Sequence, residues 1–348
     1  MLPHIHRLQL ELAVPDGDSR PTLKHVAARA GVSLISASRV MRGAANVSAD
    51  LRAKVEAAAS ELGYSRNRIA GSLRGQSSDL IAVIVPSMSN HVFPPIVDGI
   101  DAALQGSRFR PVLGMTGYDI ATEETILRDL LSWTPSAVIL SGAEHTEGAR
   151  KLLSRHSGPV VEMLDTDMEP IDLAVGISQR AAGEMMAQHL IARGYRRIGF
   201  VGAWGGRDMR AAKRLAALAA AIEAAGLPPL VQYIAPEPSS LPVGAEAVGT
   251  LRAMAPDLDA VVFANDDLAL GALFACQAAG LSVPDDLALA GFNGLDMCQV
   301  IAPRLTTIQT PRFEVGRRAG ESLLAALEGE IRPDPATLPL RLIEGETT

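Results

Sequence analysis

The chain has 348 residues, of which 48% are hydrophobic, 20% charged and 4% aromatic, and its formal net charge is −7. This composition fits a globular protein of two or three domains and excludes a disordered chain or a fibre. No apolar run reaches the ~18 residues that a membrane helix needs, and residues 1–19 lack the apolar core of a signal peptide, so we expect a cytoplasmic protein. Two cysteines, Cys276 and Cys298, without a CxxC motif exclude a disulfide framework and predict buried free thiols.

The charge is unevenly distributed along the chain. The stretch from Arg20 to Gln76 holds ten Lys and Arg and three Asp and Glu, a net charge of +7, which leaves −14 for the rest of the chain. A small basic unit beside an acidic one is typical of a nucleic-acid binder with a separate sensor domain, although a solvated helical face gives the same charge. Residues 1–21 are interpreted as a flexible N-terminal extension.

Three short helices are predicted in the basic segment. Thr22 is a favoured N-cap for a first helix that Gly31 ends, and Ser33 caps a second helix over Leu34–Met41. A third helix is expected over residues 49–62. Two short helices joined by a glycine turn indicate a helix-turn-helix, whose second helix enters the DNA major groove by its N-terminal end.

Helix-turn-helix geometry predicts which side chains of this domain, residues 22–66, reach DNA. Leu34, Ile35 and Arg39 are expected at base edges, and because Leu34 and Ile35 are apolar, they favour thymine methyl groups. Hydroxyl side chains suit phosphate oxygens. The polar candidates are Thr22, Ser33, Ser36 and Ser38, with Asn46 and Ser48 between the second and third helices.

The segment Thr22–Leu73 resembles the head of the lactose-repressor (LacI/GalR) family of regulators, through the helix-turn-helix and the stretch VSADLRAKVEAAASELGYSRNRIAGSLR. The resemblance implies a hinge over residues 67–78 that becomes helical on operator DNA. It also implies that Leu73 is inserted into the minor groove and kinks the DNA; the alternative is a linker residue that touches the next domain. The further DNA-contact candidates of this segment are Tyr64, Asn67 and Arg68.

Beyond Gly75, apolar runs alternate with helical stretches, which predicts doubly wound parallel α/β sheets. Strands are expected at residues 80–86, 111–116, 137–141, 159–164, 173–177, 197–202, 231–235, 260–264 and 287–291. Helices are expected at residues 93–105, 123–133, 179–193, 214–225, 243–254 and 268–279. Nine strands exceed one comfortable open sheet, so we expect two lobes with a ligand cleft at the carboxyl ends of the strands. The lobes are assigned to residues 79–176 with 310–338, and to residues 177–309 with 339–348.

This body resembles the periplasmic-binding-protein-like sensor of the LacI/GalR family. The likeness rests on VPSMSNHVFPPIVDGID, RGYRRIGFVG, RLAAL, FANDDLALGA, VPDDLALAGFNG and PRLTTIQTPR, and it covers nearly all residues after Leu80. Within the family, PSMSNHVF, GYDIATEE, VVEMLD and QTPR are similar to gluconate repressors. The resemblance implies a small sugar acid as the effector in the cleft.

Carried over residue by residue, the same resemblance implies the effector contacts. Asn90 and Phe93 follow the first strand, Arg214 begins RLAAL, and Asn265 belongs to the Asn-Asp motif. Asn293 stands where many relatives have an aspartate, so the effector site lacks one negative charge and can accept an anionic ligand. Arginine supplies the paired N–H donors that a carboxylate needs. The further effector-binding candidates are Arg210, His145 and Glu162.

Structural alternatives stay open at several of these positions. Arg214 is otherwise a surface or interface charge and Phe93 a core residue, and Glu162 either reaches the cleft or pairs with a nearby base. His91 faces the cleft or the surface. Asp266 is expected to be a helix cap rather than a ligand contact.

No catalytic signature occurs in a fitting context: a Walker loop, GxSxG, HExxH and a dinucleotide fingerprint are all missing from the sequence, so we expect neither an enzyme nor a cofactor.

We expect a nucleoid-associated repressor that leaves a palindromic operator when a sugar acid closes the cleft. Two heads must meet two half-sites, which implies a homodimer. The alternatives are a neutral sugar or a purine as effector, or, in another class, a solute-binding protein, which would have no use for the head.

Overall fold

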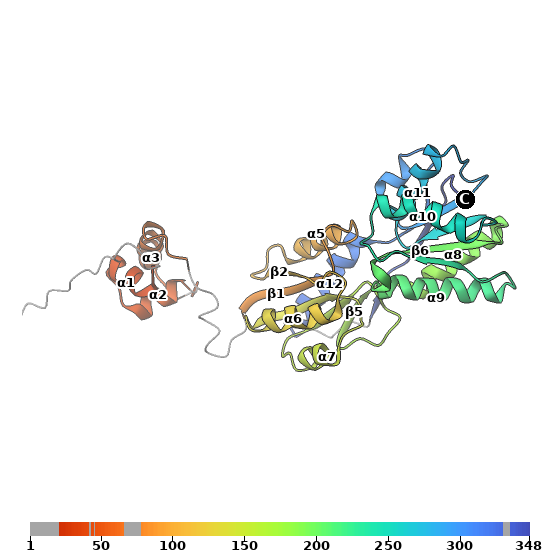
Figure 1. Ribbon diagram of the computed structural model, residues 1–348. Coiled ribbons are helices and arrows are strands. Elements are labelled where there is room, and N and C mark those ends of the chain that lie inside the picture. The colour runs from red at the N-terminus through yellow and green to blue at the C-terminus, as the bar shows by residue number, and fades with distance from the viewer. Residues whose placement is uncertain (1–20, 42, 45, 66–77, 330–334) are drawn as a thin grey trace, which may run out of the picture. The chain divides into compact units, whose positions relative to one another are not determined.

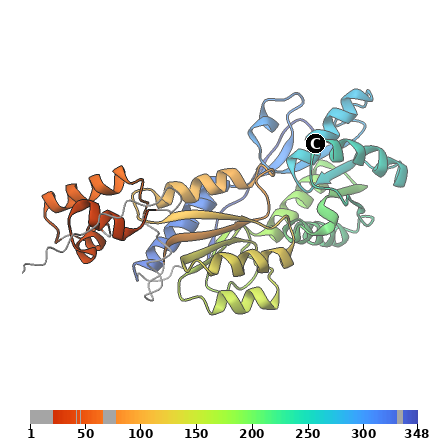
Figure 2. The same cartoon turned by 60° about the vertical axis from the view of Figure 1, so that its left-hand side comes forward.

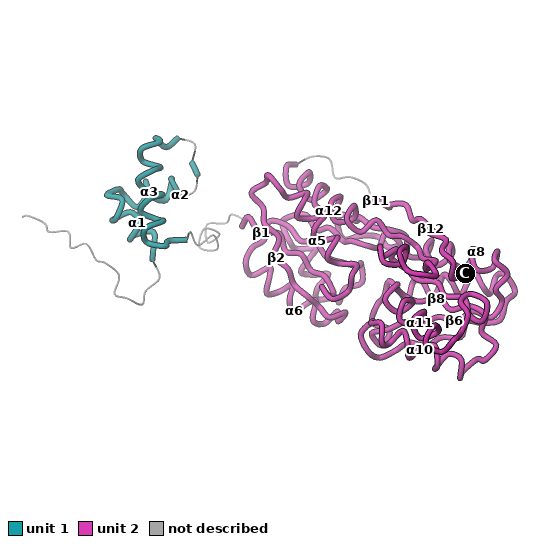
Figure 3. Tube along the Cα trace, turned by 90° about the horizontal axis from the view of Figure 1, so that it is seen from above, with its two compact units in different colours: residues 1–76 teal, residues 77–348 magenta. Residues whose placement is uncertain are grey.

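The computed structural model describes residues 21–41, 43–44, 46–65, 78–329 and 335–348. The chain divides into two compact units, residues 1–76 and residues 77–348 (Figure 3). The expected N-terminal extension and the expected hinge lie outside the described residues, except for Pro21 and Ser78.

The first unit is a bundle of three helices, α1 (Leu23–Ala30), α2 (Leu34–Met41) and α3 (Ala49–Glu61) (Figure 1). The predicted helices are confirmed, and α3 ends one residue earlier than expected. Gly31 takes the left-handed conformation, with φ of 65°, that ends α1 and turns the chain into α2. The core of the bundle consists of Val26, Ala27, Ala37, Val40, Val55, Ala58 and Ala59.

The second unit contains two six-stranded sheets, of which the first has the strand order β11-β5-β4-β3-β1-β2 and is parallel throughout. Its strands are β1 (Ser78–Val85), β2 (Arg110–Met115), β3 (Pro135–Ser141), β4 (Val160–Met163), β5 (Leu173–Gly176) and β11 (Ala336–Thr337). Alternate residues of β1 pack on opposite faces of the first sheet. Ile81 and Val83 meet helices α5 (Phe93–Leu104) and α12 (Arg312–Leu327), while Ile84 meets α6 (Ile120–Leu131) and α7 (Glu147–Ser154).

The second sheet has the order β12-β10-β9-β8-β6-β7, and only β12 runs antiparallel to its neighbour. Its strands are β6 (Ile198–Gly202), β7 (Val231–Ile234), β8 (Ala260–Phe263), β9 (Ala288–Asn293), β10 (Thr306–Gln309) and β12 (Arg341–Ile343). Four helices cover it, α8 (Gln179–Arg193), α9 (Met209–Ala224), α10 (Leu241–Met254) and α11 (Asp266–Ala278) (Figure 2). Two 3₁₀ turns, η1 (Trp204–Gly206) and η2 (Asp296–Gln299), follow β6 and β9.

The chain passes between the two lobes three times, from β5 to α8, from β10 to α12 and from β11 to β12. The predicted parallel α/β class is confirmed, and all nine expected strands are present with ends shifted by up to two residues. The sequence analysis missed the short strands β10, β11 and β12, and the helices α7 and α12. It also began α9 too late, because α9 starts at Met209 and not at Arg214.

Candidate functional site

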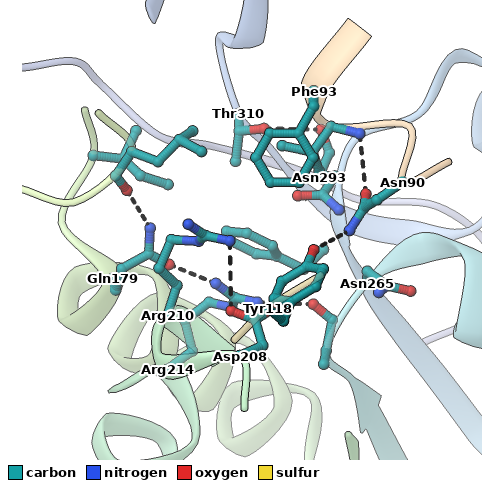
Figure 4. A pocket seen from close by; sticks show the side chains of 15 residues that line it. Asn90, Phe93, Tyr118, Gln179, Asp208, Arg210, Arg214, Asn265, Asn293 and Thr310 are labelled. Carbon is teal, nitrogen blue, oxygen red and sulfur yellow. Dashed lines mark hydrogen bonds and ion pairs between the residues drawn. The ribbon is translucent and has the colours of Figure 1, made fainter. Parts of the chain in front are cut away.

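A cavity that opens to solvent is lined by residues of both lobes of the second unit (Figure 4). The segments that follow β1, β2, β4, β5, β6, β8, β9 and β10 contribute to it, as the carboxyl ends of parallel strands do in open α/β sheets. Six of the eight residues predicted for the effector site line it. They are Asn90, Phe93, Arg210, Arg214, Asn265 and Asn293.

Arg214 is held rigidly on the floor of this cavity. Its Nη1 donates to Oε1 of Gln179 at 2.5 Å and its Nη2 to the carbonyl of Ala264 at 2.9 Å. The guanidinium carbon lies 3.8 Å from the centre of the Phe292 ring, in a cation–π contact. No carboxylate among the described residues makes a hydrogen bond or an ion pair with Arg214, and burial lowers the pKa of the guanidinium to about 10. Arg214 is therefore a buried cation whose hydrogen-bond partners are neutral groups.

Arg210 lies one helical turn earlier on α9 and has a different environment. Its Nη2 is 3.7 Å from Oδ1 of Asp208, and its guanidinium carbon is 5.7 Å from the centre of the Phe93 ring. Asp208 is the N-cap of α9, where its Oδ1 accepts a hydrogen bond from the amide of Ala211 at 3.3 Å. Since Arg210, Arg214 and Asp208 are the charged residues of the cavity wall, the wall carries a net charge of +1.

The opposite wall of the cavity is aromatic. Nδ2 of Asn90 donates to the hydroxyl of Tyr118 at 2.6 Å, and the Tyr118 ring meets Phe93 edge to face at 6.4 Å and lies 4.4 Å from the Trp204 ring. Burial raises the pKa of the Tyr118 hydroxyl, and Asp208 adds to this effect. The phenol is therefore neutral at physiological pH and available as a hydrogen-bond partner.

Two asparagines come from strand ends of the second lobe. Asn265 is the N-cap of α11, because its Oδ1 accepts from the amide of Leu268 at 3.1 Å. Asn293, at the end of β9, has a φ of 120°, which is rare outside glycine and is found at functional sites. Its carbonyl accepts from Arg312 at 2.8 Å, which ties the end of β9 to the start of α12.

The expectation that Asp266 caps a helix is wrong, because Asn265 occupies the N-cap. Asp266 is fully buried behind the cavity and accepts hydrogen bonds from the hydroxyl of Thr307 at 2.6 Å and the amide of Leu295 at 2.7 Å. Burial raises the pKa of this carboxyl group, and the two hydrogen bonds oppose that change. Asp266 therefore joins α11 to β10 and to the loop after β9.

The expectation that His145 and Glu162 face the effector is also wrong. The side chains of both residues are fully buried away from the cavity, with Nδ1 of His145 2.6 Å from Oε1 of Glu123 and Nε2 3.1 Å from Oε1 of Glu162. Burial disfavours the charged imidazole, but the two carboxylates outweigh that effect and raise the pKa of His145 to about 9. Of the two readings of Glu162, pairing with a nearby base is the one observed.

The structure also tests the expectations for His91 and for the two cysteines. The side chain of His91 is 57% exposed and its Nδ1 lies 3.0 Å from Oδ1 of Asp267, so His91 is at the surface and joins the two lobes. Cys276 and Cys298 are buried free thiols, as predicted. Within the described ranges, no three His, Cys, Asp or Glu side chains are placed so that they could hold a metal ion.

The sequence analysis missed four polar residues of the cavity, namely Tyr118, Gln179, Asp208 and Thr310. Three of them follow strands β2, β5 and β10 at the carboxyl end, and the fourth is the N-cap of α9. The position of polar residues after predicted strands was the signal that could have identified Tyr118 and Gln179. A second cavity adjoins the first through the shared residues Tyr118, Asp208 and Arg210.

In the first unit, α2 presents apolar side chains to solvent. Leu34 is 44% and Ile35 is 73% exposed at the start of the helix, where the sequence predicts base contacts. Ser33 caps α2, since its Oγ accepts from the amide of Ser36 at 3.0 Å, and the two hydroxyls lie 2.9 Å apart. Two apolar side chains in water at the N-terminal end of such a helix indicate a surface that another molecule covers.

The other predicted DNA contacts occupy several environments. Nη2 of Arg39 donates to the carbonyl of Asn46 at 3.0 Å, so it fixes the loop before α3. Ser48 is the N-cap of α3, and Tyr64 is half-buried against the core of the bundle. Thr22 is exposed and Ser38 is half-buried. Asn67, Arg68 and Leu73 lie outside the described residues.

Comparisons with known proteins agree with both units. The family model for bacterial regulatory proteins of the lacI family matches residues 22–67, and that for a periplasmic binding protein-like domain matches residues 187–348. The HTH-type transcriptional regulator GntR of Pseudomonas aeruginosa is 40% identical over 94% of this chain and 96% of its own length.

Two solved structures are similar over nearly the whole chain. A crystal structure of a LacI-family regulator from Silicibacter pomeroyi is 40% identical and has a TM-score of 0.89, over 94% of this chain and 99% of that chain. The lac repressor dimer bound to operator and the anti-inducer ONPF is 27% identical with a TM-score of 0.79, over 94% and 99% of the two chains.

A helix-turn-helix unit and a two-lobed α/β unit with a polar cavity between its lobes define a ligand-responsive transcription regulator. With these relatives, the chain belongs to the LacI family of bacterial regulatory proteins. It is a DNA-binding regulator rather than an enzyme, as the sequence predicts. None of the described helices is both long and apolar enough to cross a membrane.

Proposed function

We propose that this regulator represses genes for the use of gluconate or a related keto-sugar acid, and that the sugar acid binds in the cavity and releases the operator. The observation that carries the proposal is the charge of the cavity wall. Arg214 is buried without a carboxylate partner among the described residues, and the wall has a net charge of +1. A buried cation without an anion is unfavourable, so an anionic effector stabilises this arrangement.

We also propose that two copies bind a near-palindromic operator in the cytoplasm, at the nucleoid. The exposed Leu34 and Ile35 read thymine methyl groups, and Arg39 adds a base contact when it leaves the carbonyl of Asn46. Hydroxyls of Thr22, Ser33, Ser36 and Ser38, with Asn46, Ser48, Tyr64, Asn67 and Arg68, contact the DNA backbone, and Leu73 opens the minor groove. Support comes from the match of residues 22–67 to the lacI family.

A neutral sugar or a purine is the second candidate effector. The observation in its favour is the aromatic lining, because the rings of Phe93 and Tyr118 border the cavity and aromatic side chains suit a sugar ring or a heterocycle. The two candidates differ in charge, and the charge of the wall favours the acid.

The test combines calorimetry with an operator-release assay. Gluconate should bind at micromolar to millimolar strength and release DNA that the protein has selected from a random pool, while glucose and purines should bind far more weakly. Arg214→Ala should weaken gluconate binding by ~10-fold or more, because the cavity wall loses one of its two positive charges, and it should still bind DNA. Tighter binding of glucose or a purine than of any sugar acid would contradict the proposal.

A further inference from the structure

Arg210 and Asp208 form an ion pair at the border of the two adjoining cavities. Both residues line both cavities, and their side chains are 12% and 17% exposed. Resting on the proposed function, we propose that this pair is the specificity-determining element of the cleft: the carboxylate of an anionic effector replaces Asp208 as the partner of Arg210. A neutral effector leaves the pair in place.

Arg214 is less suited to make this distinction, although it is the more buried arginine. Its two terminal nitrogens donate to Gln179 and to the carbonyl of Ala264, and its flat face rests on Phe292. These contacts fix the guanidinium in one orientation. These contacts engage both terminal nitrogens of Arg214 and leave only part of its five N–H donors for a ligand, so Arg214 contributes its positive charge to the cavity while Arg210 is the arginine better placed to turn its whole fork to a carboxylate.

Arg210 has the freedom that Arg214 lacks. Its contact with Asp208 is 3.7 Å long, beyond the distance of a charge-assisted hydrogen bond. Figure 4 shows its side chain crossing the cavity between Asp208 and the Phe93 ring. A ligand carboxylate at ~2.8 Å from both terminal nitrogens is a stronger partner than Asp208 at this separation.

Asp208 remains satisfied when Arg210 exchanges partners. Its Oδ1 accepts from the amide of Ala211 at the N-terminus of α9, where the helix dipole favours a negative charge. The exchange therefore leaves no carboxylate without a partner. When an anionic effector is bound, the net charge of the cavity wall and the ligand together is zero. When a sugar without a carboxylate is bound, the wall keeps its net charge of +1.

The experiment measures gluconate and glucose binding by calorimetry in five proteins. Arg210→Gln removes the charge and keeps a polar, hydrogen-bonding end on a shorter side chain, and Asp208→Asn removes the competing anion while an amide oxygen still caps α9. The matched controls are Arg207→Gln and Asp119→Asn. Arg207 and Asp119 line only the second cavity, and Asp119 is likewise an N-cap, with its side chain accepting from Ala121. The fluorescence midpoint of urea unfolding checks that each variant is folded.

Arg210→Gln should weaken gluconate binding at least tenfold and leave glucose binding within about twofold of the wild-type value, so the preference for the acid collapses. Asp208→Asn should tighten gluconate binding at least threefold. The two controls should each change gluconate binding by less than twofold.

The outcomes separate this inference from the proposed function. If the wild-type protein binds no sugar acid, the proposed function fails and this inference fails with it. If the wild type prefers gluconate and Arg210→Gln keeps the same preference, or Asp208→Asn behaves like Asp119→Asn, the role of the ion pair is refuted while the proposed function stands. A variant that loses binding of both ligands and unfolds at lower urea is replaced by Arg210→Lys, which should retain part of the preference for the acid.

Discussion

Raising the pH from about 6 to about 9.5 should destabilise the second unit through one side chain, His145. Its imidazole is fully buried between Glu123 and Glu162, with both ring nitrogens at hydrogen-bond distance from a carboxylate oxygen. Only the doubly protonated ring donates on both sides. Burial opposes this charge, but the two carboxylates raise the pKa of His145 from 6.5 to about 9.

The sign and the size of the effect follow from linkage. The folded state holds the proton more tightly than the unfolded state, so this contribution to stability is complete below pH 6.5 and is lost as the pH rises through about 9. The difference between these two pKa values corresponds to at most about 3 kcal/mol of unfolding free energy. That is a large share of the ~5–15 kcal/mol that holds a typical domain folded.

Urea unfolding followed by tryptophan fluorescence measures this effect, because both tryptophans, Trp133 and Trp204, belong to residues 77–348. His145→Gln is the matched variant, since an amide keeps hydrogen bonds but cannot gain the charge. Burial also raises the pKa of both cysteines, which adds a decline in stability near pH 9 that the two proteins share. The difference between wild type and variant should fall with pH, and a difference that stays constant between about pH 6 and 9.5 would refute the reasoning.

Three further predictions concern other parts of the chain. Asp266→Ala should lower the unfolding free energy by ~2–4 kcal/mol in the same urea assay, because the Thr307 hydroxyl and the Leu295 amide lose their buried acceptor; Glu246→Ala, at an exposed position of α10, is the control and should change it by less than ~1 kcal/mol. Ile35→Ala should make the head less sensitive to replacement of operator thymine by uracil, whereas the wild type should lose ~0.8 kcal/mol per contacted methyl group in a gel-shift titration. Operator affinity should fall by ~10³-fold or more between about 50 and 200 mM salt if six or more phosphates are contacted, and a flat salt response would contradict the assigned DNA-binding face.

The first unit could be predicted closely because its signals are local. Gly31 ends α1 through its own left-handed conformation, and Ser33 and Ser48 cap the following helices through contacts three residues away. Hydrogen bonds of such short range are set by neighbouring residues, so a pattern of residue types locates them. The side-chain contact of Arg39 with Asn46 depends on the loop between helices, and no pattern in the sequence predicts it.

In the second unit the strands could be recognised, while part of the helical layer could not. Parallel strands buried on both faces appear as apolar runs, and the nine expected runs are strands. Helix α12 was missed because its buried face includes Gly316, Ala319 and Gly320. A Cβ at Gly316 would meet the backbone of Ile96 on α5, so this face is made for close packing, and glycine within a helix lowers the intrinsic helix propensity that identifies a helix in the sequence.

The net charge of the cavity wall depends on which residues the fold brings together, and the sequence alone does not show this. The sequence predicts an anionic effector partly because Asn293 stands where relatives have an acid, yet the cavity contains a carboxylate after all, that of Asp208. This residue was not identified because it follows a loop and caps a helix, and nothing in its sequence position shows that it meets Arg210. The positive wall results from two arginines against one aspartate, and one of these arginines is already paired. The proposed preference for an anion therefore depends on how easily Asp208 gives up its partner, which is a property of the 3.7 Å contact and of the N-terminus of α9 rather than of any single substitution.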